Sequence, residues 1–170
     1  MPVKEGRAEP VPNLENTMSR KSKMPPPTPQ PDAEPTLGFT IWITLRRGMS
    51  PQSEQMFERS LADYMDSRDL QWWGTHLCAA IGSDDRGLSE EDQVDLLLWL
   101  VDGLTSATVE IGRLGPHTGM PVRRGSVPVV RVQSSDLMLI PIVWLYRAGR
   151  VNAKQVLDML GGFVTTSTVH

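Results

Sequence analysis

The order of hydrophobic patterns between residues 37 and 111 constrains the fold more than any other feature of this sequence. Apolar and polar side chains alternate from Leu37 to Leu45 with many β-branched residues, which predicts a strand. Ser50-Pro51 then provides a helix N-cap and a proline at the first helical position. An amphipathic pattern follows to Arg68, with Phe57, Leu61, Tyr64, Met56 and Met65 on its apolar side. The sequence therefore predicts a strand that leads into a helix.

A second part of the pattern follows. Two short apolar runs, residues 70–73 and 76–81, flank Gly74-Thr75 and predict two strands, joined as a hairpin or arranged around a bulge. Ser89 then opens a helix whose acidic first turn includes Asp92 at the capping-box position. We expect Gly103 to end this helix in the left-handed conformation, before a last strand that ends at Ile111.

The order strand, helix, strand, strand, helix, strand is that of the ferredoxin-like fold, an α+β class in which two helices cover one face of a four-stranded sheet. We predict such a domain over residues 36–114. Because this fold serves RNA binders, metal carriers, enzymes and regulators alike, the function has to be argued from side chains.

The segments on either side of this domain have a different character. Residues 1–35 have no periodicity and contain six prolines between positions 25 and 35, which predicts a disordered basic and proline-rich tail. Residues 115–170 begin as a connection rich in glycine and proline, within which residues 127–132 form a candidate edge strand.

The rest of the C-terminal extension is apolar. We expect Pro141 to bend the segment 136–148, and we expect a short helix over residues 152–160 that Gly161-Gly162 stops. An extension of this kind either packs on the domain, or covers an exposed patch or forms a homodimer contact. Both alternatives remain open from the sequence.

The charges are segregated along the chain although the formal net charge is only -3. Residues 36–114 contain thirteen acidic residues and six arginines, whereas the segments before residue 25 and after residue 114 are net basic. Basic segments beside an acidic domain are compatible with cationic contacts to phosphates and with a protein partner of the domain itself.

Several function classes lack support. A single cysteine, Cys78, excludes an intramolecular disulfide framework and favours a reducing, cytoplasmic compartment. The chain has no apolar run long enough to span a membrane and no nucleotide-binding or hydrolase motif. His76 and Cys78 would share one strand face, but two ligands without a third are weak support for a metal. We expect no enzyme, no cofactor and no metal.

Trp72 and Trp73 are adjacent on a predicted strand and therefore point to opposite faces of the sheet. One of them faces the helices. We expect the other, taken as Trp73, to face solvent, the C-terminal extension or a partner.

Short motifs resemble the YggL family of small bacterial proteins. They are Leu37-Gly38-Phe39, Gly48, Ser89-Glu90-Glu91, Trp99-Leu100 and Val109-Glu110, and their order and spacing match over about residues 36–114. That family is described as binding the large (50S) ribosomal subunit, so the resemblance implies a ribosome-associated protein with a basic N-terminal segment before the first strand.

The sequence thus predicts a non-enzymatic protein that binds the large ribosomal subunit through ribosomal RNA, a ribosomal protein or both. The candidate contact residues are Arg20, Lys21, Lys23, Arg46, Arg47, Trp73, Arg123 and Arg124. The alternative is an interaction or regulatory module, or an inhibitor, that dimerises or binds a target through its C-terminal apolar segment. A homodimer is compatible with either function.

Overall fold

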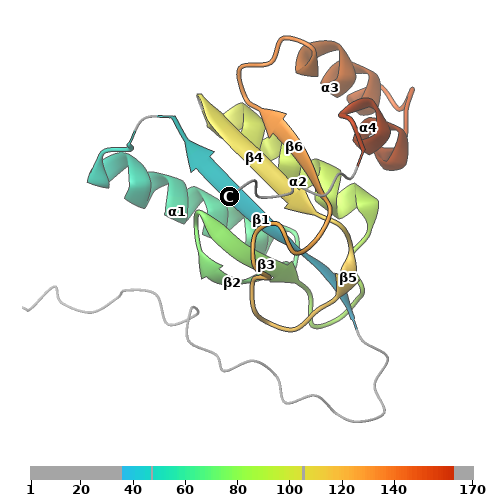
Figure 1. Cartoon of the computed structure of the whole chain (residues 1–170). Coiled ribbons are helices and arrows are strands. Elements are labelled where there is room, and N and C mark those ends of the chain that lie inside the picture. Colours follow the sequence, from blue (N-terminus) through green and yellow to red (C-terminus); the bar gives the residue numbers. More distant parts are fainter. Residues whose placement is uncertain (1–35, 47, 105, 163–170) are drawn as a thin grey trace, which may run out of the picture.

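The computed structural model describes residues 36–46, 48–104 and 106–162, and within them the chain forms one antiparallel sheet of six strands with four helices. The strands are β1 (Leu37–Leu45), β2 (Gln71–Thr75), β3 (Cys78–Gly82), β4 (Ala107–Gly112), β5 (Gly115–Pro116) and β6 (Val129–Gln133). Their order is β2-β3-β1-β4-β6, and β5 pairs with the start of β1 (Figure 1). The predicted α+β class and the edge strand near residues 127–132 are confirmed, but the sheet is larger than the four strands expected.

The helices are α1 (Pro51–Ser67), α2 (Glu90–Gly103), α3 (Leu139–Arg147) and α4 (Ala153–Met159). α1 and α2 lie on one face of the sheet, α4 packs against α2, and α3 contacts α4 (Figure 1). The residues after position 114 therefore join the same sheet through β6 and the same core through α4. The proline-rich tail predicted over residues 1–35 lies outside the described residues.

Local sequence signals explain where the helices begin. The Ser50 hydroxyl accepts a hydrogen bond from the Ser53 amide at 3.2 Å, which satisfies one of the free N–H groups of the first turn of α1. Ser89 and Asp92 form the predicted capping box at the start of α2. Asn152 and Gln155 form another at the start of α4. The starts of α1, α2 and α4 were predicted correctly.

Strand β1 is buried on both faces. Its odd-numbered side chains Phe39, Ile41 and Ile43 point into the core between the sheet and the helices, as the alternating pattern predicts. The even-numbered Thr40 and Trp42 are only 5% exposed on the opposite face. Another part of the chain must therefore cover that second face.

Two predicted turns are wrong. The β2–β3 hairpin turns at residues 76 and 77 rather than at Gly74-Thr75. Gly74 instead sits inside β2 at φ 128°, where a Cβ atom would lie 2.3 Å from the Cys78 carbonyl oxygen, so the glycine serves a close strand approach. Gly103 does not end α2 in the left-handed region. Ser106 adopts that conformation at φ 59°, after Leu104 has left the helix in an extended conformation and entered the core.

Two further expectations need correction. Pro141 does not bend the segment 136–148, because it is the third residue of α3, where its missing N–H would have had no partner within the helix. Met56 does not belong to the apolar face of α1, since its side chain is 69% exposed.

Candidate nucleic-acid interface

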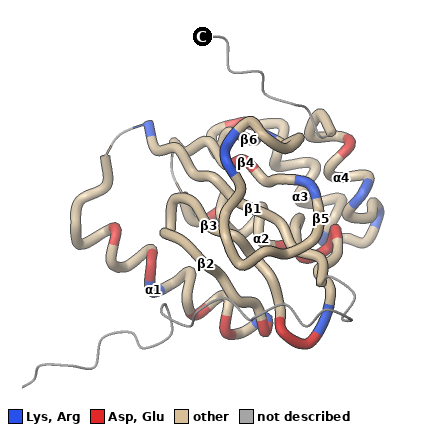
Figure 2. Tube along the Cα trace, turned by 60° about the horizontal axis from the view of Figure 1, so that its bottom comes forward, with Lys and Arg blue, Asp and Glu red and all other residues tan. Residues whose placement is uncertain are grey.

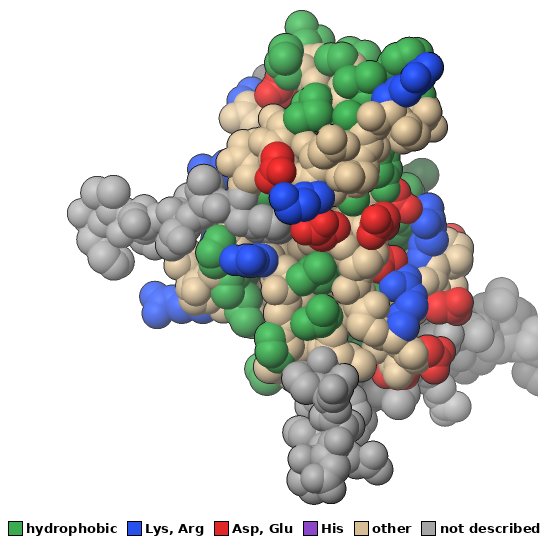
Figure 3. Space-filling view, turned by 90° about the vertical axis from the view of Figure 1, so that its right-hand side faces the viewer, with side chains coloured by type: hydrophobic (Ala, Val, Ile, Leu, Met, Phe, Trp, Pro, Cys, Tyr) green, Lys and Arg blue, Asp and Glu red, His purple; other side chains and the backbone are tan. Residues whose placement is uncertain are grey.

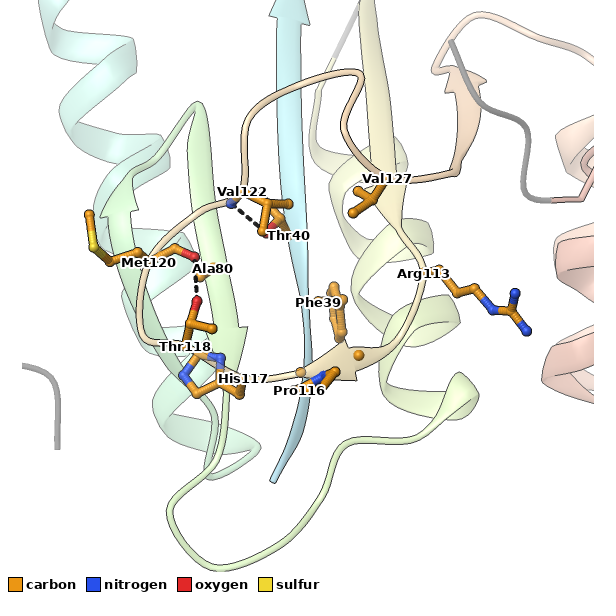
Figure 4. Close-up of a pocket in the computed structure, with 12 residues that line it drawn as sticks. Phe39, Thr40, Ala80, Arg113, Pro116, His117, Thr118, Met120, Val122 and Val127 are labelled. Carbon is orange, nitrogen blue, oxygen red and sulfur yellow. Dashed lines mark hydrogen bonds between the residues drawn. The ribbon is translucent and has the colours of Figure 1, made fainter. Parts of the chain in front are cut away.

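The connection between β4 and β6 covers the second face of the sheet. We call residues 113–128 of this connection the strap. It crosses β3 and β1 on the side away from α1 and α2 (Figures 1 and 4). The Val122 amide donates to the Thr40 hydroxyl at 3.3 Å, and Val127 lies beside Gly112 of β4. The strap thereby explains why the polar face of β1 is buried.

One end of the strap is held by His117. Its imidazole lies against Trp73, with ring centroids 4.5 Å apart, and against two glycines, Gly38 and Gly82, where any Cβ atom would come within 3 Å of the ring. The Nε2 atom of His117 is buried without a hydrogen-bond partner. Burial lowers the pKa of His117 below its ordinary value of 6.5, and the charge of Asp84 opposes this effect.

A small cavity lies beneath the strap. It has a volume of about 200 Å³ and is lined by Thr40, Ala80, His117 and the apolar side chains of the strap, among other residues (Figure 4). Pockets for small organic ligands are usually larger, about 300–1,000 Å³. The cavity is therefore small for an organic ligand, and the outer surface of the strap is the better candidate for contact with a binding partner.

The other end of the strap is fixed by a buried carboxylate. Glu110, in the middle of β4, has no exposed surface, and it lies between Trp42 of β1 and Arg131 of β6 in the strand register. Arg124 of the strap donates from Nε to Oε2 at 2.5 Å, and Arg131 donates from Nε to Oε1 at 2.6 Å. The Nη2 groups of both arginines also contact the carboxylate. Each carboxylate oxygen is thus held by one guanidinium group.

The two arginines remain half exposed, at 47% and 48% of their side-chain surface. Arg124 also donates to the Thr44 hydroxyl at 3.1 Å. Arg46, which follows β1, donates to Gln133 of β6 at 3.0 Å on the same sheet face. We call Arg46, Arg124 and Arg131 the arginine cluster. Within the described residues, the Nη1 groups of Arg124 and Arg131 have no hydrogen-bond partner, so both can donate to an external acceptor.

The arginine cluster brings together only part of the predicted contact set. Arg46 and Arg124 belong to it, and Arg123 is exposed next to Arg124 in the strap. Arg20, Lys21, Lys23 and Arg47 lie outside the described residues. Trp73 is on the same sheet face but on β2, at the far side of the sheet from β6, and His117 covers part of its ring. Of the three surroundings expected for Trp73, the structure shows a contact with the C-terminal extension, and this contact occupies part of the ring that would stack on a base.

The sequence analysis missed Glu110 and Arg131. Both are charged residues flanked by β-branched or aliphatic neighbours inside short strands, Thr-Val-Glu-Ile and Val-Val-Arg-Val. A charge at the centre of such a strand is costly unless it is paired, and this is the signal that would have linked the two residues.

The acidic residues lie mostly on the other side of the molecule. In Figure 2 the red segments follow α1 and the loop before α2, whereas blue segments mark the strap and the strand next to it. Asp92 exemplifies the acidic side. Burial raises its pKa, but hydrogen bonds from Arg86 and Ser89 outweigh this effect and lower the pKa below its ordinary value.

The residues considered for metal binding or catalysis are separated. His76 lies in the β2–β3 turn with Nε2 3.0 Å from a carboxylate oxygen of Glu54, and it does not share a strand with Cys78. His76 and Glu54 line a second, largely apolar hollow of about 440 Å³. Burial raises the pKa of the Cys78 thiol, against the effect of the Arg124 charge. Among the described residues, no three histidine, cysteine or acidic side chains gather in a way that would hold a metal ion.

Comparison of the chain with known protein families, with curated proteins and with solved structures finds no match. The YggL resemblance therefore stays a prediction. None of the helices in the described residues is long and apolar enough to cross a membrane.

Proposed function

We propose that this protein is a non-enzymatic, ribosome-associated RNA-binding protein, and that its arginine cluster contacts phosphates of the large (50S) ribosomal subunit. One observation carries the proposal. The buried carboxylate of Glu110 orients two guanidinium groups whose Nη1 donors point to no partner in the described chain. Guanidinium groups match phosphate oxygens in geometry, and prior orientation lowers the entropy lost on binding.

The charge balance of the face supports a polyanion as the ligand. The three arginines of the cluster and the neighbouring Arg123 carry four positive charges, of which the buried Glu110 compensates one, so this surface is positive although the whole chain is acidic. The acidic side of α1 and α2 would turn away from RNA. Such a distribution favours one docking orientation over the others.

The choice of ribosomal RNA rests on the YggL resemblance. We further propose that β1 to β4 with α1 and α2 form a ferredoxin-like unit, which the strand order β2-β3-β1-β4 and the placement of both helices on one face support. In this proposal β5 and β6 are additions to the unit. Arg131 and the strap then belong to the C-terminal extension, so the extension would supply much of the RNA contact.

The experiment is sedimentation of the full chain with purified 50S subunits at low and at raised salt concentration. Arg123→Glu and Arg46→Glu are the informative variants, because neither side chain contacts the buried Glu110. Arg59→Glu is the matched control, since Arg59 is an exposed arginine of α1 on the acidic side.

We expect the wild-type chain to sediment with 50S subunits and to be released by salt. Arg123→Glu and Arg46→Glu should each weaken binding and lower the slope of log affinity against log salt by about one, whereas the control should bind like the wild type. If all four proteins stay at the top of the gradient at both salt concentrations, or if Arg59→Glu weakens binding as much as Arg123→Glu, the proposal is wrong.

The exposed apolar side chains of α3 and of the turn before it favour a second candidate, a regulatory or inhibitory module that binds a protein target. Leu137, Met138, Ile140 and Trp144 are all at least 66% exposed. Binding through such a surface would depend little on salt, which distinguishes this candidate in the same experiment.

A further inference from the structure

The surface of α3 is unusual because it is apolar without a break. Ile140 and Trp144 are 67% and 66% exposed and lie four residues apart on one side of α3, and Leu137, in the turn before the helix, is 79% exposed. In Figure 3 the hydrophobic side chains gather at the top of the view, over α3. Exposed patches that contain tryptophan and methionine are typical of interfaces between proteins. We call these three residues the α3 strip.

The charges at the two ends of the α3 strip differ in sign. Asp136 precedes the strip and Arg147 ends α3, and both side chains are exposed. Asp136 lies just before α3, where one of its carboxylate oxygens accepts a hydrogen bond from the Met138 amide at 3.0 Å, and Arg147 is the last residue of α3. Between them the segment has no charged residue. The surface therefore has an acidic end, an apolar centre and a basic end.

We propose that the α3 strip is the contact of a homodimer in which two α3 helices pack antiparallel. A two-fold axis near Ile142 would place Ile140 of one copy against Trp144 of the other. The same axis would bring Asp136 of each copy close to Arg147 of its partner. A parallel pairing would instead place like charges together, so the charge pattern selects the antiparallel arrangement.

The contacts that α3 makes within its own chain are compatible with this dimer. Leu139 and Ile142 point inward to the core, and Tyr146 donates to Asp95 of α2 at 3.1 Å, so the inner side of α3 is already fixed to its own chain. Arg147 contacts Asp102 at 2.7 Å, but both side chains are more than half exposed. An exposed ion pair of this kind contributes little, and Arg147 can contact Asp136 of a second copy as well.

The test measures the mass of the full chain by analytical ultracentrifugation over a range of concentrations. Because one helix per copy makes a small interface, we expect a reversible dimer with micromolar affinity. Trp144→Glu should weaken it at least about 100-fold, since the dimer contains the change twice. Met56→Glu is the matched control on α1, where Met56 is equally exposed, and it should leave the dimer unchanged.

Charge exchange tests the orientation. Asp136→Arg and Arg147→Asp should each weaken the dimer, and the two changes combined in one chain should restore it. On a Cys78→Ala background and with oxidised glutathione as the added oxidant, a mixture of the Ile140→Cys and Trp144→Cys variants should form an intermolecular disulfide, whereas each variant alone should form much less.

Dimerisation through the α3 strip and RNA binding through the arginine cluster use different residues, so either can fail without the other. A chain that stays monomeric at every concentration overturns it, and so does a dimer that Trp144→Glu does not weaken. A dimer in which the combined charge exchange fails to restore affinity, or in which Ile140→Cys alone forms the disulfide, rules out the antiparallel contact.

Discussion

The arrangement around Glu110 predicts an asymmetry between its removal and the removal of its partners. The double variant Arg124→Met with Arg131→Met leaves a carboxylate that has no exposed surface and no cationic partner. Breaking a buried ion pair in this way costs about 3–5 kcal/mol. Glu110→Gln instead leaves two guanidinium groups that are 47% and 48% exposed and can be hydrated. Its cost is the loss of charge-assisted hydrogen bonds, about 1–3 kcal/mol.

The assay is urea unfolding at neutral pH, followed by far-ultraviolet circular dichroism. We expect the double arginine variant to lose at least about 1 kcal/mol more stability than Glu110→Gln. A triple variant with methionine at all three positions removes every charge and should recover most of the loss, because apolar replacement of a buried ion cluster is often neutral. If the double arginine variant is as stable as Glu110→Gln, the carboxylate is hydrated in solution and the account of its burial is refuted.

Three further predictions concern the strap and one helix start. Gly38→Ala should lower the free energy of unfolding by about 1–3 kcal/mol in urea, because the new Cβ atom would lie 2.5 Å from the Ile81 carbonyl oxygen. Gly115→Ala on the paired strand is the control, since the space around Gly115 is open and the change should have little effect. Because folding lowers the pKa of His117, the unfolded chain binds a proton at this imidazole more readily than the folded chain does. The stability due to neutral His117 is therefore present above about pH 6.5 and is lost as the pH falls through the lower pKa of the folded chain. His117→Gln should remove that part of the pH dependence in urea titrations, and an unchanged profile would contradict the assignment. Ser89→Ala should cost about 1 kcal/mol of stability by removing the capping box of α2, and a loss of less than a few tenths would show that the cap is dispensable.

Local signals in the sequence were sufficient for most of the elements but not for their partners. The alternation of β1 and the caps at Ser50, Ser89 and Asn152 act over a few residues, so they predict strands and helix starts correctly. The turn at Gly74 was predicted wrongly because a glycine allows either a turn or a close backbone approach, and only the neighbouring strand distinguishes them.

The candidate site depends on contacts that no local pattern specifies. Arg46 and Arg124 were selected from the sequence as basic candidates for phosphate contact, yet their relation to Glu110 and Arg131 depends on the register of β4 with β6 and on the path of the strap. Such long-range pairing is set by the packing of the whole sheet. The same holds for His117, whose contact with Trp73 joins residues far apart in the chain.

The position of Glu110 in the chain also sets a sequence of events during synthesis. The glutamate is made 14 residues before Arg124 and 21 residues before Arg131. A nascent chain that has emerged only as far as β4 can align four strands, but the side of β4 that carries Glu110 is still open to water, because the strap and β6 have not been made. Burial of the carboxylate without a cationic partner would cost several kcal/mol, which is a large fraction of the stability of a small domain. The segments that complete the sheet also carry Arg124 and Arg131, so the anion is buried only together with its partners.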